Sequence, residues 1–134
     1  MFEVYDLIYM LEKYNKIIEN DIYELSKSFA IRVVNLCNYL KESKNESIMS
    51  KQLFRSGTSI GANVFEGKNA QSRADFCNKM NVALKEASES YYWIDLIHDT
   101  QYISDIEYDS IVSDIKRIVV VLTKIVKATK ADKS

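Results

Sequence analysis

Apolar residues recur every three or four positions along four long segments of the chain, the spacing that places side chains on one face of an α-helix. The first predicted helix begins near Asp21 and has the apolar positions Leu25, Phe29, Val33, Leu36 and Leu40. The second, from about residue 48 to 66, has Leu53, Gly57, Ile60 and Val64. The third, from about 73 to 99, has Phe76, Met80, Ala83, Ala87, Ser90, Ile94 and Ile97. The fourth, from about 106 to 128, has Ile111, Ile115, Ile118, Leu122 and Ile125.

Short polar stretches separate these helices, namely residues 41–47 (KESKNES), 66–71 (EGKNAQ) and 100–105 (TQYISD). Ser72 is placed to cap the third helix, with Asp75 three residues later. The chain has no proline and three glycines, too few to build many tight turns. The prediction is an all-α fold, an antiparallel up-down-up-down four-helix bundle.

The N-terminal segment forms a separate part of the pattern. Val4, Ile8, Leu11 and Ile18 keep helical phase before Asn20, and Asp21 with Glu24 reads as a capping box that restarts the helix. Residues 2–19 also continue in phase into the following helix, which would give one helix of roughly 60 Å at about 1.5 Å per residue. Both alternatives stay open. The predicted organisation is an N-terminal helix or helical extension (1–19), a bundle domain (20–129) and a frayed tail (130–134).

Residues 52–67 (QLFRSGTSIGANVFEG) are unusual for a helix because they are rich in glycine, serine and threonine. Gly57 and Gly61 remove side-chain bulk from one face, which permits close approach of a neighbouring helix. Beside this face runs a polar stripe of Gln52, Ser56, Ser59, Asn63 and Glu66. Either a subunit interface or close helix packing within one chain explains the pattern. The predicted interface or close-packing residues are Gln52, Arg55, Ser56, Gly57, Ser59, Gly61, Asn63 and Glu66.

Charged side chains near this segment predict a polar network, because a carboxylate that leaves water needs a cationic partner. We expect Arg55 to pair with Glu66, Glu86 or Glu89, inside the bundle or across subunits, and Lys85 to pair with Glu89 at i,i+4. Replacing Arg55 with alanine would then weaken assembly or stability.

Charge is distributed in blocks although the net charge is only −1. Residues 86–114 hold eight acids and no base, whereas residues 115–134 hold six bases and one acid. Blocks of this kind usually complement one another as solvated helix faces, within a subunit or across an interface. A nucleic-acid surface is the alternative, and its candidate contacts are Lys51, Lys68, Arg73, Lys79, Lys116, Arg117, Lys124 and Lys127.

Nothing in the sequence indicates catalysis, a cofactor or a metal. His98 is the single histidine; Asp95, three residues earlier, is close enough in the helix to pair with it, but we expect an exposed histidine near a helix end. Cys37 and Cys77 match no metal or redox spacing and are expected to fill the core. The glycines lack the P-loop spacing. No apolar run spans a bilayer and the N-terminus has acids where a signal peptide needs bases, so we expect a cytoplasmic protein.

The segment SKQLFRSGTSIGANVFEG (50–67), followed by SRADFCNKMNVALKEASESYYWIDLI (72–97), resembles the four-helix-bundle family of 23S rRNA intervening-sequence proteins. The resemblance runs from about Ile22 to about residue 128. It implies a bacterial homo-oligomer, in that family a ring-like pentamer, with a non-enzymatic structural or scaffold role. A more distant resemblance to the accessory variability determinant of diversity-generating retroelements implies the alternative, a nucleic-acid-binding accessory protein for a reverse transcriptase or an RNA-processing step. Residues 1–19 precede the usual family start.

Overall fold

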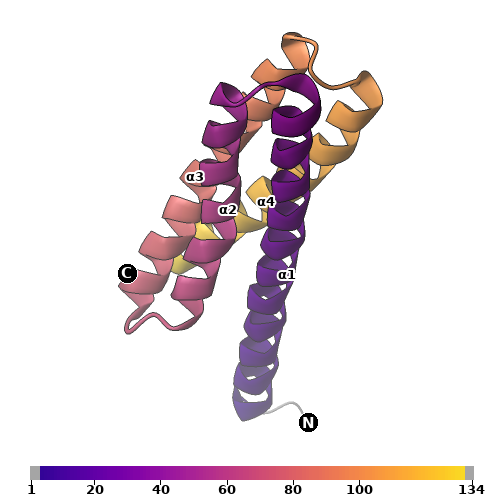
Figure 1. Cartoon of the computed structure of the whole chain (residues 1–134). Helices are drawn as coiled ribbons and strands as arrows, with labels where there is room; N and C mark the ends of the chain where they lie inside the picture. The colour runs from indigo at the N-terminus through magenta and orange to yellow at the C-terminus, as the bar shows by residue number, and fades with distance from the viewer. Residues whose placement is uncertain (1–3, 132–134) are drawn as a thin grey trace.

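Four helices make up the fold in a computed structural model, which describes the backbone of residues 4–131 and the side chains of residues 21–130. They are α1 (Val4–Lys44), α2 (Ile48–Lys68), α3 (Arg73–Asp99) and α4 (Asp105–Ala131). Each helix contacts its chain neighbours, and α4 returns to contact α1. Short connections reverse the chain after each helix, so that consecutive helices run in opposite directions (Figure 1). The predicted all-α bundle is confirmed.

Helix α1 is a single helix of 41 residues, and the alternative of a restart at Asp21 is wrong. The helix passes through Asn20 and Asp21 without a break, so Asp21 and Glu24 cap nothing. A side chain can cap a helix only where backbone N–H groups lack helical partners, and here the preceding turn supplies carbonyls. At the other end, α4 continues to Ala131, beyond its predicted end near residue 128. Most of the tail expected to fray, residues 132–134, lies outside the described residues.

The core lies between the four helices and follows the predicted stripes closely in α2, α3 and α4. Leu53, Ile60, Ile94, Ile118 and Leu122 are fully buried. In α1 the phase differs: Leu25 and Leu36 are only partly buried, whereas the buried seam consists of Ile22, Ser26, Phe29, Val33, Cys37 and Leu40. Phe76 likewise lies at the edge of the core rather than inside it.

Side chains fix the starts of the last two helices. Ser72 Oγ accepts a hydrogen bond from the Asp75 N–H (3.0 Å), which confirms the predicted cap of α3. Ser104 and Glu107 form a reciprocal capping box at the start of α4, which the sequence reading missed.

The start of α2 is held by a buried carboxylate. Glu46, 6% exposed, accepts the backbone N–H groups of Ile48 (3.0 Å), Met49 (2.8 Å) and Ser50 (2.8 Å). Burial tends to raise the pKa of Glu46, but the hydrogen bonds from Met49, Ser50 and Ile48 outweigh it and lower that pKa. Asn45, which has a positive φ, follows α1 in the left-handed conformation that closes many helices.

Candidate assembly interface

Gly57 and Gly61 lie against α1 of the same chain. A Cβ at Gly57 would sit 2.9 Å from both Cγ atoms of Val33, so the close approach of α1 and α2 depends on glycine here. A Cβ at Gly61 would be 3.6 Å from the carbonyl oxygen and Oγ of Ser26, an ordinary contact. Close packing within one chain therefore accounts for Gly57. A subunit contact by these residues stays a prediction.

The polar stripe of α2 lies beside α3. Ser56 is buried and accepts a hydrogen bond from Ser90 Oγ (2.9 Å), so two small side chains bring α2 and α3 together. Ser59 and Asn63, half-buried, each donate to a backbone carbonyl four residues earlier. Gln52 is exposed at the far end of the stripe.

Arg55 connects α2 to α3, and two of its three predicted partners lie next to it. It forms an ion pair and hydrogen bond with Glu89, and its Nη1 lies 3.5 Å from Glu86 Oε2. That Glu86 oxygen is buried and accepts no hydrogen bond from the described residues, so Arg55 stabilises it by charge alone. The guanidinium also lowers the pKa of Glu89, which in addition accepts the indole N–H of Trp93.

The other members of the predicted network lie elsewhere. Glu66 does not reach Arg55 but pairs with Lys79 (2.9 Å), a second link between α2 and α3. Lys85 is exposed on the outer side of α3. The network is therefore two separate ion-pair groups along one helix contact rather than one connected cluster.

Helices α1 and α2 have three exposed large apolar side chains that the sequence reading missed. Phe54 (44% exposed) and Phe65 (54% exposed) lie on one face of α2, and Ile31 (55% exposed) projects from α1. Phe65 also contacts Tyr23, with ring centroids 6.0 Å apart. We call Ile31, Phe54 and Phe65 the apolar face. Its signal in the sequence was the spacing of the two phenylalanines, about three helical turns, out of phase with the buried stripe of the same helix.

The candidate nucleic-acid contacts divide into two groups. Lys116, Arg117, Lys124 and Lys127 are all exposed on the outer side of α4, around the half-exposed Val120. We call these four bases and Val120 the basic face of α4. The remaining four are dispersed over α2 and α3: Lys68 lies over the Tyr23 ring (4.5 Å to the centroid), Lys79 pairs with Glu66, and Lys51 and Arg73 are exposed.

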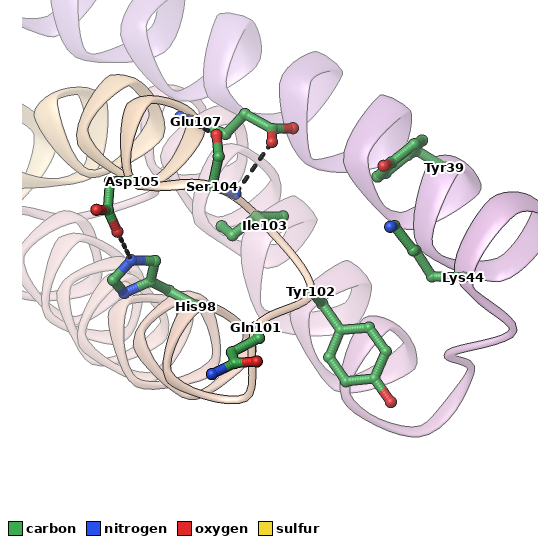
Figure 2. Close-up of a pocket in the computed structure, with 9 residues that line it drawn as sticks. All are labelled: Tyr39, Lys44, His98, Gln101, Tyr102, Ile103, Ser104, Asp105 and Glu107. Carbon is green, nitrogen blue, oxygen red and sulfur yellow. Dashed lines mark hydrogen bonds and ion pairs between the residues drawn. The ribbon is translucent and has the colours of Figure 1, made fainter.

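A shallow hollow of about 470 Å³ lies at the α3–α4 turn and is lined in part by Tyr39, Lys44 and His98 (Figure 2). His98 is half-buried rather than exposed, and its partner is Asp105 (2.7 Å) instead of Asp95. Both differences follow from the chain reversal, which stacks Tyr108 on the His98 ring (centroids 4.1 Å apart) while the Tyr108 hydroxyl donates to Asp95. The hydrogen bond to Asp105 raises the pKa of His98, against the opposing effect of burial.

Within residues 21–130, no group of three or more His, Cys, Asp or Glu side chains is arranged to hold a metal ion. Cys37 and Cys77 are buried free thiols, and burial, with the nearby Glu46 charge, raises the pKa of Cys37 to about 11. None of the four helices, over the part of the chain that is described, is long and apolar enough to cross a membrane.

Comparison with protein families shows to which family this chain belongs. The family model described as 23S rRNA-intervening sequence protein matches residues 18–124. The chain belongs to this family. The part shared with other 23S rRNA-intervening sequence proteins therefore begins within α1 and includes all of α2 and α3 and most of α4.

A solved structure supports the same assignment. The chain is similar to a crystal structure of a protein with unknown function from the S23 ribosomal protein family of Bacteroides thetaiotaomicron, with 49% identity and a TM-score of 0.81. The match covers 82% of this chain and 98% of that one. No curated protein matches the chain. Neither the family description nor that of the solved relative names an enzymatic activity.

Proposed function

We propose that this protein is the non-enzymatic subunit of a cytoplasmic homo-oligomer with a scaffold role, a pentamer as the family resemblance implies. The observation that supports the proposal is the apolar face. Three large apolar side chains of the adjacent helices α1 and α2 are each about half exposed. Exposed aromatic and aliphatic side chains gathered on one surface are typical of protein interfaces.

The polar stripe supports the same choice of surface by elimination. That side of α2 already has partners on α3 of its own chain, at Ser56, Arg55 and Glu66. These polar groups are therefore not free to bind a second subunit. Phe54 and Phe65 lie on the other, exposed side of α2. We therefore place the proposed subunit contact on the apolar face.

Light scattering coupled to size-exclusion chromatography tests this proposal at micromolar protein concentration. The wild-type chain should elute as a single oligomer, and Phe54→Glu with Phe65→Glu should reduce its mass to that of a monomer without changing its helical circular dichroism. Tyr92→Glu is the matched control, because Tyr92 is equally exposed (57%) on α3. A monomeric wild type refutes the proposal. If the Tyr92 variant is monomeric while the Phe54/Phe65 variant stays oligomeric, the subunit interface lies on α3 instead of the apolar face.

A second candidate function is nucleic-acid binding by the basic face of α4. We infer it from four exposed bases on one helix face, which a ring of subunits would repeat several times. Binding to structured RNA and to duplex DNA, measured by fluorescence anisotropy at low and high salt, tests it. Affinity should fall steeply as salt rises, and no binding at low salt excludes this function.

A further inference from the structure

The N-terminal part of α1 extends beyond the bundle. The ammonium group of Lys68, the last residue of α2, lies over the Tyr23 ring, which places the end of α2 level with residue 23 of α1. Helix α1 nevertheless reaches back to Val4. Residues 4–20 thus continue the helix for roughly 25 Å at about 1.5 Å per residue. Figure 1 shows this part of α1 running past the ends of the other described helices, with none of them alongside it. We call residues 4–20 the extension.

The sequence of the extension is that of a helix that needs a partner. Val4, Ile8, Leu11 and Ile18 form an apolar stripe in phase with Ile22, which is buried in the core. A helix of this length is marginal in water by itself, and most of its stability in proteins comes from covering its apolar side. The family match begins at residue 18, so Val4, Ile8 and Leu11 precede the part of the chain that is shared with the family.

Charge indicates what the partner is. The extension contains three acids and two bases, a net charge of −1, and its acids Glu12 and Glu19 are spaced two helical turns apart. Residues 115–131 contain five bases and no acid, a net charge of +5. Four of these bases belong to the basic face of α4, where Val120 offers an apolar centre at 52% exposure. The segments 4–20 and 115–131 are equal in length, so one can lie along the whole of the other.

The two segments do not meet within one chain. Figure 1 shows the C-terminal end of α4 on the α3 side of the bundle, whereas the extension continues α1 beyond the bundle, far from that end. We propose that the extension of one copy lies along the basic face of α4 of a neighbouring copy, its apolar stripe over Val120 and its acids beside the surrounding bases. Such a contact joins different surfaces of the two copies, which is the kind of interface that closes rings. This inference rests on the proposed homo-oligomer and adds a second subunit contact to it.

A charge-swap experiment on the full chain tests the contact. One variant has Glu12→Lys and Glu19→Lys, the second has Lys124→Glu and Lys127→Glu, and the third combines all four substitutions. Sedimentation velocity over a concentration series at low salt measures the dissociation constant for assembly. Each double variant should raise it about tenfold or more, and the combined variant should restore it towards wild type. Glu42→Lys with Asp109→Lys is the control, since both are exposed acids away from the two segments and change the charge by the same amount as the first variant.

The outcomes separate this inference from the proposal on which it rests. A wild-type chain that stays monomeric refutes both. A wild-type oligomer that neither double variant weakens, or that the combined variant fails to restore, overturns the extension contact and leaves the apolar face as the interface. If the Lys124/Lys127 variant loses only RNA or DNA binding while assembly is unchanged, the basic face of α4 binds nucleic acid and the inference is wrong.

Discussion

Helix α2 and the α1/α4 pair represent two different ways of joining helices in this bundle. Helix α2 meets α1 through Gly57 and α3 through Ser56 and Ser90, all small residues that bring backbones close together. Helices α1 and α4 are instead tied by Arg32, which bonds Asp114 (2.6 Å) and Ser110, and beside this link a groove of about 430 Å³ stays open. In that groove Ile106 is 82% exposed. Small residues thus allow α2 to pack closely against α1 and α3, whereas the long side chain of Arg32 bridges α1 and α4 beside a groove. We call the α1–α4 side the open side of the bundle.

The largest effects are expected at Gly57 and Glu46, and Gly57 is considered first. Gly57→Ala forces a Cβ to within 2.9 Å of Val33. Because a branched side chain has little freedom to move away, the substitution should lower the free energy of unfolding by about 1–3 kcal/mol.

The matched control is Gly61→Ala, four residues away, whose Cβ meets only ordinary contacts. The gain in helix propensity should there raise the free energy of unfolding by up to about 1 kcal/mol. Urea unfolding measures both variants. Equal effects of the same sign would contradict the difference drawn between the two glycines.

Replacing Glu46 removes the acceptor of three backbone N–H groups at the start of α2. Glu46→Ala should therefore lower the free energy of unfolding by about 1–3 kcal/mol. The folded pKa of Glu46 is below its unfolded value. Its contribution is thus complete above an unfolded pKa of about 4.3 and is lost as the pH falls through the folded pKa.

The difference in stability between wild type and Glu46→Ala should consequently shrink in acid. Thermal unfolding of both proteins at pH 7, 5 and 3 measures this difference. A difference that is constant over the whole range would argue against the carboxylate cap.

The Arg32–Asp114 pair on the open side is partly exposed, with side-chain exposures of 40% and 34%. Arg32→Ala should therefore change the free energy of unfolding by less than about 1 kcal/mol. Its effect should instead be local, with faster amide hydrogen exchange in the first turns of α4. Lys41→Ala, an exposed base on the same helix, is the control. A loss of stability as large as that of Gly57→Ala would mean that the open side is as tightly coupled as the α2 side.

The smallest effect is expected at His98, at the α3–α4 turn. Its folded pKa is raised by Asp105. Its stabilising contribution is therefore complete below an unfolded pKa of about 6.5 and is lost as the pH rises through the folded pKa. Wild type should lose melting temperature between pH 6 and pH 8 relative to His98→Gln. Asp105→Asn should remove most of this pH dependence, and a wild-type profile parallel to that of His98→Gln would exclude the link.

The sequence was sufficient for the bundle itself because in α2, α3 and α4 the predicted apolar stripe is the one that is buried. It was insufficient for α1, where Ile22 and Cys37 border a second apolar row at Leu25 and Leu36. Which row is buried depends on where α2 approaches, and that is set by Gly57 opposite Val33, a contact between two different helices. Local periodicity contains no such information.

The candidate site was predictable only in part, for a similar reason. Arg55 was expected to pair with Glu66, Glu86 or Glu89, and it lies beside Glu86 and Glu89 because α2 and α3 turn these helix faces towards each other. For Glu66, both Arg55 and Lys79 were possible partners. Which of them it meets depends on how far α2 and α3 are displaced relative to each other along their axes, and the structure has Lys79. Phe54 and Phe65 escaped notice because a lone phenylalanine in a helix is most often a core residue, and exposure is visible only once the neighbouring helices are in place.

The unbroken passage of α1 through Asn20 and Asp21 has a mechanical consequence. A continuous helix couples rotation to length, so one residue inserted near this point would turn everything before it by about 100° and shift it by about 1.5 Å. Four inserted residues would bring the original orientation nearly back, about one turn farther out. The direction in which each side of the projecting helical arm faces is therefore set only by the number of residues between it and the bundle, because α1 has no break there that could act as a hinge.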